Sequence, residues 1–409
     1  MLNELKTAAA CGALLLAFAP ATAQAADCGT IELGAALSAS GIYASNGQNT
    51  KNGYEFAVKK INDTGGVKVG DKCYNLKIIY YDDESTPARA AQLVERLISQ
   101  DKIKFVLGPY SSPMTKAILP VTEKYKTPVV QSEAASRSLF TQGYKYHFGI
   151  VATSEKYLTP VIDMAADYAK KSGKKPSDVK VAMIYQDDSF SLDVRQGVVD
   201  LVKTYNMKTV IDDRMPKDLN DITTFFTKVK ALKPDVLLIS GHEKGAATAA
   251  RQMGEHKTDV PLIGITHCES AKVVQDFPKI AEGFVCPTQW DETMKASDPM
   301  FGTAMEYNKA IAAAYNYKFV PYQTAQASAA VYVWKAAFEK AGTLDQEKVR
   351  EALTKIDMPT FYGHVKFADD GSNPGKTIVM RQIQGGKYVV VAPPAIAAAP
   401  VVYPRNTHY

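Results

Sequence analysis

Short apolar runs alternate with amphipathic stretches along most of the chain, which is typical of strands and helices in a parallel sheet. The first series predicts strands at 30–37, 76–81, 105–107, 129–131 and 146–150. Helical periodicity between them predicts helices at 51–62, 88–100 and 114–124, with a short turn near Ser138. This alternation predicts a doubly wound α/β fold.

The same rhythm restarts after Thr153. It predicts strands at 179–185, 209–212, 236–240, 262–266 and 284–286. It predicts helices at 155–171, 192–205, 221–232, 244–254 and 271–280. Two such series in succession indicate two doubly wound parallel-sheet lobes rather than one large sheet.

The C-terminal part of the chain departs from this alternation. Helices are expected at 298–316, 322–341 and 346–355, and strands at 364–367 and 378–391 with a hairpin at Gly385-Gly386. Because helices without intervening strands need a sheet to cover, we expect the chain to return to the first lobe and then cross again to the second. The Pro- and Ala-rich segment 393–409 lacks periodicity and is expected to be a disordered tail.

The first 25 residues have the pattern of a secretory signal peptide. Lys6 precedes an apolar run over 8–19, and Ala23 and Ala25 place small residues where a signal peptidase requires them. The run is shorter than the roughly 20 residues that span a bilayer. We therefore expect an exported, soluble chain that begins near Ala26.

The size and charge of the chain limit the classes of protein it can be. A chain of 409 residues exceeds what one hydrophobic core usually supports, and 46% hydrophobic content can supply two cores. The net charge of +5 is spread along the chain without blocks, which argues against a nucleic-acid tail or a polybasic membrane patch. Common catalytic and nucleotide-binding motifs are missing, so an enzyme is not expected.

Four of the five cysteines follow the predicted signal peptide, and an exported chain makes disulfides plausible. Cys28 and Cys73 each lie three residues before the apolar part of a predicted strand, so their side chains would meet if those strands are parallel neighbours. Cys268 and Cys286 each end an apolar run and can pair likewise. Zinc is the alternative, but no C-x-x-C spacing occurs and the six histidines are scattered, so no metal or other cofactor is expected.

The turn at 108–113 is the most informative candidate site, because ligands of doubly wound sheets bind beyond the carboxyl ends of the strands. It contains Tyr110 and Ser111, and it places Ser112 as the N-cap of a helix with Pro113 at the first helical position. A helix N-terminus offers free N–H donors and the positive end of a dipole, which favour a carboxylate. The alternative is an ordinary capped helix.

Further polar turns follow the neighbouring strands. In the turn at 131–136, the Ser136 hydroxyl and N–H are candidates to bind the same carboxylate as Ser112. In the second lobe, Phe190 is a candidate to cover the apolar part of a ligand, and His242 and His267 to hydrogen-bond its far end. Structural roles, as caps or as core histidines, are the alternatives for these polar residues.

These residues occur in an order and spacing that resemble a known family. The chain resembles the type I periplasmic binding proteins of branched-chain amino acid ABC transporters, the leucine/isoleucine/valine-binding group. The resemblance covers nearly the whole exported chain, including the segments 31–41, 53–66, 81–83 and 108–112, and Gly363 with the strand after it.

The resemblance implies a Venus-flytrap fold, in which two α/β lobes are joined by a three-segment hinge. The crossings are expected near 149–153, 287–290 and 362–364. Lobe 1 is then expected to comprise 26–149 and 288–362, and lobe 2 to comprise 150–287 and 363–392.

The resemblance also implies roles for single residues. Ser112 matches the serine that binds the ligand carboxylate in the family, helped by positions that match Ala134 and Ser136. Positions that line the family's pocket with aromatic rings match Phe190, His242 and Asn46; the first of these stays aromatic.

One departure from the family pattern bears on the ligand. Where the family has an acid that neutralises the ligand's ammonium, this chain has Thr266-His267, and the nearby Glu269 does not align with that position. An unpaired buried ammonium is costly. Either another acid serves, or the ligand has no α-amino group, so both an amino acid and an aromatic or other organic carboxylate remain open.

The resemblance implies a monomeric periplasmic protein that closes around a small carboxylate-bearing solute and delivers it to the permease of an ABC importer. A sensory module with the same two-lobed shell, which would signal to a partner, is the alternative.

Overall fold

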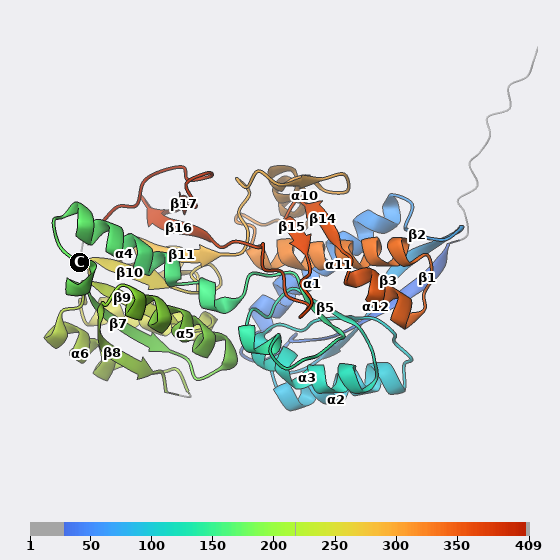
Figure 1. The fold of residues 1–409 in the computed structure, drawn as a ribbon, viewed down its shortest axis with the longest axis horizontal. Helices are drawn as coiled ribbons and strands as arrows, with labels where there is room; N and C mark the ends of the chain where they lie inside the picture. The colour runs from blue at the N-terminus through green and yellow to red at the C-terminus, as the bar shows by residue number, and fades with distance from the viewer. Residues whose placement is uncertain (1–27, 217, 406–409) are drawn as a thin grey trace, which may run out of the picture.

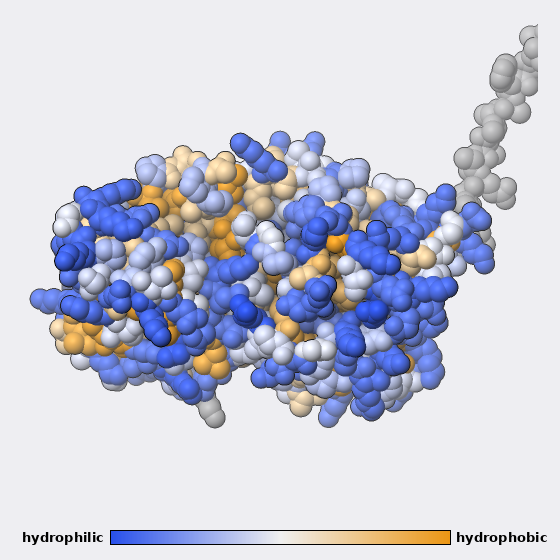
Figure 2. Space-filling view, in the orientation of Figure 1, coloured by the Kyte–Doolittle hydropathy of each residue, from blue (hydrophilic) through white to orange (hydrophobic). Residues whose placement is uncertain are grey.

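The structure is a computed structural model, and it describes residues 28–216 and 218–405. Over these residues the chain forms two lobes that lie side by side (Figure 1). Figure 2 shows that the same face is mostly hydrophilic, with several smaller apolar patches, one of which lies near the junction of the lobes. No helix within this part of the chain is long and apolar enough to span a bilayer. The predicted signal peptide at 1–25 lies outside the described residues.

The first lobe is built on a sheet whose strands, in the described part of the chain, run in the order β2-β3-β1-β4-β5-β6. The strands are β1 (Gly29–Leu37), β2 (Val67–Val69), β3 (Lys72–Asp82), β4 (Val106–Leu107), β5 (Val129–Gln131) and β6 (His147–Gly149). All neighbours are parallel except β2 and β3. The five strands predicted for this lobe are confirmed, whereas β2 is too short to give an alternating pattern.

The helices of the first lobe come from two distant parts of the chain. They are α1 (Ala44–Asp63), α2 (Pro87–Ser99), α3 (Ser112–Lys124), α10 (Ala304–Tyr315), α11 (Tyr322–Ala341) and α12 (Gln346–Leu353). Helix α11 packs against α1, and the Ser328 hydroxyl donates a hydrogen bond to the Gly53 carbonyl at 2.6 Å (Figure 1). The predicted return of the chain to the first lobe is confirmed.

The second lobe is built on a sheet with the described strand order β17-β16-β11-β10-β9-β7-β8. The strands are β7 (Lys180–Tyr185), β8 (Lys208–Arg214), β9 (Val236–Ser240), β10 (Leu262–Ile265), β11 (Phe284–Thr288), β16 (Val379–Gln384) and β17 (Lys387–Ala392). Strands β9 and β10 are buried along their whole length, as expected for parallel strands covered on both faces. The predicted hairpin at Gly385-Gly386 joins β16 to β17.

Helices cover this second sheet as well. They are α4 (Thr159–Lys171), α5 (Ser189–Thr204), α6 (Thr223–Leu232), α7 (Glu243–Glu255), α8 (Val273–Asp276) and α9 (Pro278–Ala281). The single helix expected at 271–280 is interrupted, because Pro278 starts a new turn there.

The crossing segments between the lobes lie side by side and bond to one another. The N–H of Gly149 donates to the Gly371 carbonyl at 2.9 Å. The side chain of Gln289 exchanges hydrogen bonds with the backbone of Ala152, at 3.1 and 2.9 Å. These contacts form a hinge in which each crossing supports its neighbour.

The third crossing lies later than predicted. The segment expected to cross, 362–364, instead belongs to an antiparallel hairpin of β14 (Asp357–Thr360) and β15 (Gly363–Lys366). This hairpin stays with the first lobe, where the ring of Phe361 stacks on Tyr307 of α10. The chain therefore crosses between β15 and β16, and residues 363–366 lie in lobe 1 rather than in lobe 2.

The prediction of a disordered tail is wrong for residues 393–405, because they pack against the second lobe. Gln382 of β16 donates to the Val402 carbonyl at 2.9 Å and accepts from its N–H at 2.7 Å. The N–H of Arg405 donates to Pro261 at 3.0 Å. The segment has no helix or strand, but these backbone groups form hydrogen bonds with the second lobe. Residues 406–409 lie outside the described residues.

Disulfides join Cys28 to Cys73 and Cys268 to Cys286, the pairings expected from the strand ends. The parallel register of β1 and β3 places Gly29 opposite Tyr74, which brings the first pair together. Neighbouring strands β10 and β11 do the same for the second pair.

The start of helix α1 approaches the end of β1 too closely for a side chain. A Cβ added at Gly47 would lie 1.8 Å from the carbonyl oxygen of Ser38. The same Ser38 donates a hydrogen bond to Asp83 at 2.6 Å, so β1 cannot easily shift away.

We expect Gly47→Ala to destabilise the protein by about 1–3 kcal/mol, because overpacking forces the backbone to move. The measurement is the urea midpoint of unfolding. Gly375→Ala is the matched control, since a Cβ there meets nothing within 4 Å. Equal midpoints for the two variants would contradict the close packing of α1 on β1.

Candidate functional site

A narrow cavity lies between the lobes, at the carboxyl ends of strands from both sheets. Its volume is about 20 Å³, which is enough for one water molecule, so the lobes are closed on each other and a larger ligand requires them to open. The lining residues are Tyr110, Ser112, Ser132, Glu133, Ala135, Val151, Tyr157, Phe190, His242, His267, Tyr322 and Gln326.

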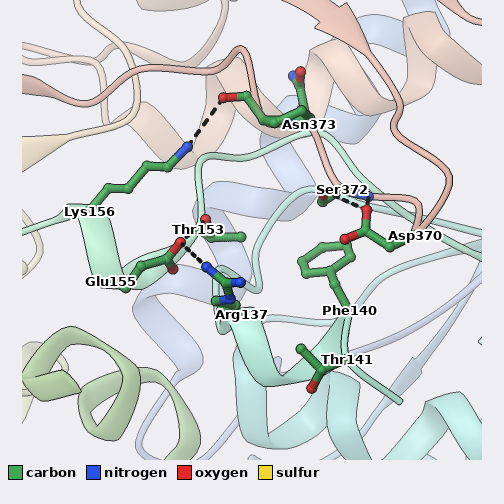
Figure 3. A pocket seen from close by; sticks show the side chains of 10 residues that line it. Arg137, Phe140, Thr141, Thr153, Glu155, Lys156, Asp370, Ser372 and Asn373 are labelled. Atoms are coloured by element: carbon green, nitrogen blue, oxygen red, sulfur yellow. Dashed lines mark hydrogen bonds and ion pairs between the residues drawn. The ribbon is translucent and has the colours of Figure 1, made fainter. Parts of the chain in front are cut away.

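A wider cavity of about 230 Å³ lies at the hinge, away from these residues (Figure 3). Its charged groups have partners of their own. Arg137 lies 3.8 Å from the carboxylate of Glu155, and the Lys156 ammonium donates to the Pro374 carbonyl at 3.2 Å. The charged groups of this cavity thus serve contacts within the hinge, and we do not take it as the ligand site.

Ser112 lies in the wall of the interlobe cavity at the start of helix α3. The N-cap is Ser111, one residue earlier than predicted, so Ser112 is the first helical residue and Pro113 the second. The Ser112 hydroxyl accepts a hydrogen bond from the Ser136 N–H at 3.1 Å, which leaves its proton for a ligand acceptor. With the N–H groups of the first helical turn beside it, Ser112 lies where the sequence predicts the carboxylate of a ligand.

Ser136 contacts the opposite lobe instead of the cavity. Its hydroxyl lies 3.1 Å from the Ser189 carbonyl and also contacts the carboxylate of Asp193 on α5. The same carboxylate accepts from the Ser138 N–H at 3.1 Å. These bonds join the lobes, and we call Ser136, Ser138 and Asp193 the interlobe latch.

Phe190 and two histidines form the lobe 2 wall of the cavity. The Phe190 ring lies 5.4 Å from His242 and 5.2 Å from His267, centre to centre. His242 Nδ1 lies 3.4 Å from the Tyr110 hydroxyl of lobe 1, and its Nε2 lies 3.3 Å from the Asp188 carboxylate. Burial holds the pKa of His267 well below its usual range, and the neighbouring His242 adds to this, so His267 is neutral.

Other predicted residues lie near the cavity without lining it. The hydroxyl of Thr266 donates to the Gly241 carbonyl at 2.8 Å, so it holds the backbone. Asn46 donates to Glu243 of the opposite lobe at 3.3 Å. Ala134 is buried, but its neighbour Ala135 faces the cavity. For the residues that do line the cavity, a role in ligand binding stays a prediction.

Glu133 is a charged lining residue that was not among the predicted site residues. It is 8% exposed, and its carboxyl accepts from Gln326 at 2.6 Å and from Ser132 at 3.3 Å. Burial raises the pKa of Glu133 to about 8. Its position in the turn at 131–136, already suspected as a site, was the available signal.

The family model for periplasmic binding proteins matches residues 30–387. The chain belongs to this family.

Curated relatives of this periplasmic binding protein cover nearly the whole chain. The Leu/Ile/Val-binding protein BraC3 of Rhizobium johnstonii is 26% identical over 94% of this chain and 99% of its own length. A Leu/Ile/Val-binding protein homolog of Brucella suis is 24% identical over 96% of this chain and 97% of its own.

Solved structures share the fold. LivJ of Streptococcus pneumoniae, in complex with isoleucine, matches with a TM-score of 0.75 and 23% identity, over 92% of this chain and 100% of its own. An ABC transporter solute-binding protein of R. palustris, in complex with benzoate, matches with a TM-score of 0.74 and 18% identity, over 92% and 98%. The type I periplasmic binding fold of this chain is therefore established.

In this periplasmic binding protein Glu269 is engaged elsewhere and does not reach the cavity. Its carboxylate contacts the guanidinium of Arg381, which also lies 3.6 Å from Asp291. Within residues 28–216 and 218–405, no group of three or more His, Cys, Asp or Glu side chains is arranged to hold a metal ion.

We expect Asp193→Ala to favour the open form, because the interlobe latch exists only when the lobes are closed. Loss of these hydrogen bonds should cost about 1 kcal/mol, which shifts the open-to-closed ratio roughly fivefold. Small-angle X-ray scattering of the ligand-free variant should then show a larger radius of gyration. The control is Asp200→Ala on the same helix, where the Asp200 carboxylate accepts a hydrogen bond from Gln196 of that helix. An unchanged radius for Asp193→Ala would contradict the latch.

Proposed function

We propose that this protein is the solute-binding component of an ABC importer, and that it captures a small carboxylate-bearing molecule between its lobes. The observation that carries the proposal is Ser112, which sits at the N-terminus of α3 in the wall of the interlobe cavity. Relatives named for leucine, isoleucine and valine, and neighbours bound to isoleucine or benzoate, support it. These ligands share a carboxylate next to an apolar body.

Other residues that line the cavity, from both lobes, suit that apolar body. Phe190, Val151 and the rings of Tyr157 and Tyr322 line the cavity, and burial raises the pKa of both tyrosines, so they stay uncharged. Lys and Arg are missing from the described lining residues, so the carboxylate is held by neutral donors and the helix dipole rather than by a salt bridge.

Binding proceeds by closure of the hinge. The carboxylate docks on the start of α3 in lobe 1, and lobe 2 then adds Phe190 and His242. Because these contacts form only in the closed state, the ligand shifts the population toward it. A permease in the membrane then recognises the closed form and receives the solute.

Export to the periplasm is part of the proposal. Cleavage of the signal peptide after Ala25 would release a chain that begins just before Cys28. The disulfides at Cys28–Cys73 and Cys268–Cys286 suit an oxidising compartment.

We expect a thermal-shift screen of the exported chain to find a ligand among L-amino acids and aromatic carboxylates, because a solute that binds only the native state raises the melting temperature. Uncharged polyols and amides should give no shift. A shift confined to polyols would exclude a carboxylate ligand.

We expect Ser112→Ala to weaken binding of that ligand by about tenfold or more, since a charge-assisted hydrogen bond contributes about 1.5–3 kcal/mol. Isothermal titration calorimetry measures the change. Ser172→Ala is the control, because Ser172 is exposed at the end of α4. Equal affinity for the Ser112 and Ser172 variants would overturn the assignment of the carboxylate position.

A further inference from the structure

Glu133 lies in the same narrow cavity as Ser112, but it has a different chemical environment. Its carboxyl group has neutral hydrogen-bond partners, among them the Gln326 amide at 2.6 Å, the Ser132 hydroxyl at 3.3 Å and the hydroxyl of Thr50. The side chain is almost fully buried. A carboxylate in such a place needs a compensating charge.

The titratable groups around Glu133 do not supply that charge. Tyr54 of α1, Tyr110, Tyr157, Tyr322 of α11 and Tyr362 surround the carboxyl group. Burial raises the pKa of each of these tyrosines, and proximity to Glu133 adds to the shift, so all of them are neutral.

The remaining charged and titratable groups nearby also fail to neutralise Glu133. His267, in the opposite wall, is neutral because burial lowers its pKa. The nitrogens of His242 face Tyr110 and Asp188. The buried cations of the hinge have other partners: Lys376 donates to the Tyr362 carbonyl at 2.5 Å, and Arg381 contacts Glu269.

The cavity therefore offers two unlike positions at short range. The start of α3, with Ser112, favours a negative group. The Glu133 carboxyl favours a positive one. A small molecule that carries both charges pairs with both positions, whereas a simple carboxylate leaves Glu133 protonated and without an ion-pair partner.

We propose that Glu133 binds the ammonium group of the solute and thereby selects amino acids over carboxylates that lack an amino group. The proposal rests on the carboxylate-binding function proposed above. In the family that this chain resembles, the acid that binds the ammonium lies where this chain has Thr266 and His267. The proposal assigns that role to Glu133 of lobe 1 instead.

Binding is then coupled to release of a proton. Burial raises the pKa of Glu133 to about 8, so the carboxyl is mostly protonated at neutral pH before the ligand arrives. The ammonium lowers this pKa, and the proton leaves to solvent as the ion pair forms. Affinity for an amino acid should therefore rise about tenfold per pH unit up to about pH 8 and level off above it. Affinity for a carboxylate without an amino group should not rise over this range.

The test is calorimetry of the exported chain with matched pairs of probes. L-leucine is paired with 4-methylpentanoate, and L-phenylalanine with 3-phenylpropanoate, so that each pair differs in the amino group alone. Titrations at pH 7 in buffers of different ionisation enthalpy give the number of protons released. We expect the preferred amino acid to bind at least tenfold more tightly than its partner and to release close to one proton.

Glu133→Gln supplies the second arm of the test. We expect it to weaken amino acid binding by at least about thirtyfold at pH 8, to abolish proton release and to leave the carboxylate probes unaffected. Glu351→Gln is the control, because Glu351 is exposed on α12 of the same lobe. The wild-type proton count does not depend on the variant folding.

The outcomes separate this proposal from the proposed function. Tight binding of a deaminated probe, with loss of affinity in Ser112→Ala and no proton release, would overturn the role of Glu133 and leave the carboxylate function standing. Amino acid binding that is unchanged in Glu133→Gln would also overturn it. Ligand affinity that is unchanged in Ser112→Ala would instead refute the proposed function.

Discussion

The carboxyl ends of the parallel strands in both sheets face the same gap, and this geometry determines the site. In the first lobe, the turns after β4 and β5 carry Ser112 and Glu133 into the cavity wall. In the second lobe, the turns after β7 and β9 carry Phe190 and His242. Because helices start at these turns, the gap receives free backbone N–H groups and the positive ends of helix dipoles.

Closure of the lobes changes the strength of every polar interaction in that gap. Because water leaves the gap, burying a charge without a partner costs free energy, and a charge that must find a partner selects for ligands that supply one. The latch between Ser136 and Asp193 stabilises the closed form from outside the cavity. Affinity then depends on the ligand contacts and on the latch together, and the hinge contacts at Gly149 and Gln289 keep the crossings in register.

Sequence patterns predicted most of the fold because they report burial directly. Strands such as β9 and β10 are buried on both faces and give continuous apolar runs. The third crossing was misplaced because a turn at Tyr362-Gly363 is compatible with either a crossing or a local hairpin, and the pairing of β14 with β15 decides between them. The segment 393–405 was wrongly predicted to be disordered, because tertiary contacts such as that with Gln382 hold it in place and sequence periodicity does not report them.

The site was predicted in part, for a related reason. Polar residues at strand ends identified the turns, and Ser112, Phe190, His242 and His267 do line the cavity. The sequence could not show which way each side chain in an irregular turn points. Ser136 instead bonds to the opposite lobe, and Thr266 bonds to the backbone of its own lobe. Glu133, in contrast, faces the cavity.

A crystal structure of the protein with its solute bound tests the central claim most directly. The account predicts closed lobes, with the carboxylate of the solute within hydrogen-bond distance of the Ser112 hydroxyl and the first N–H groups of α3. A solute whose carboxylate lies outside the interlobe cavity, or contacts lobe 2 alone, would contradict it.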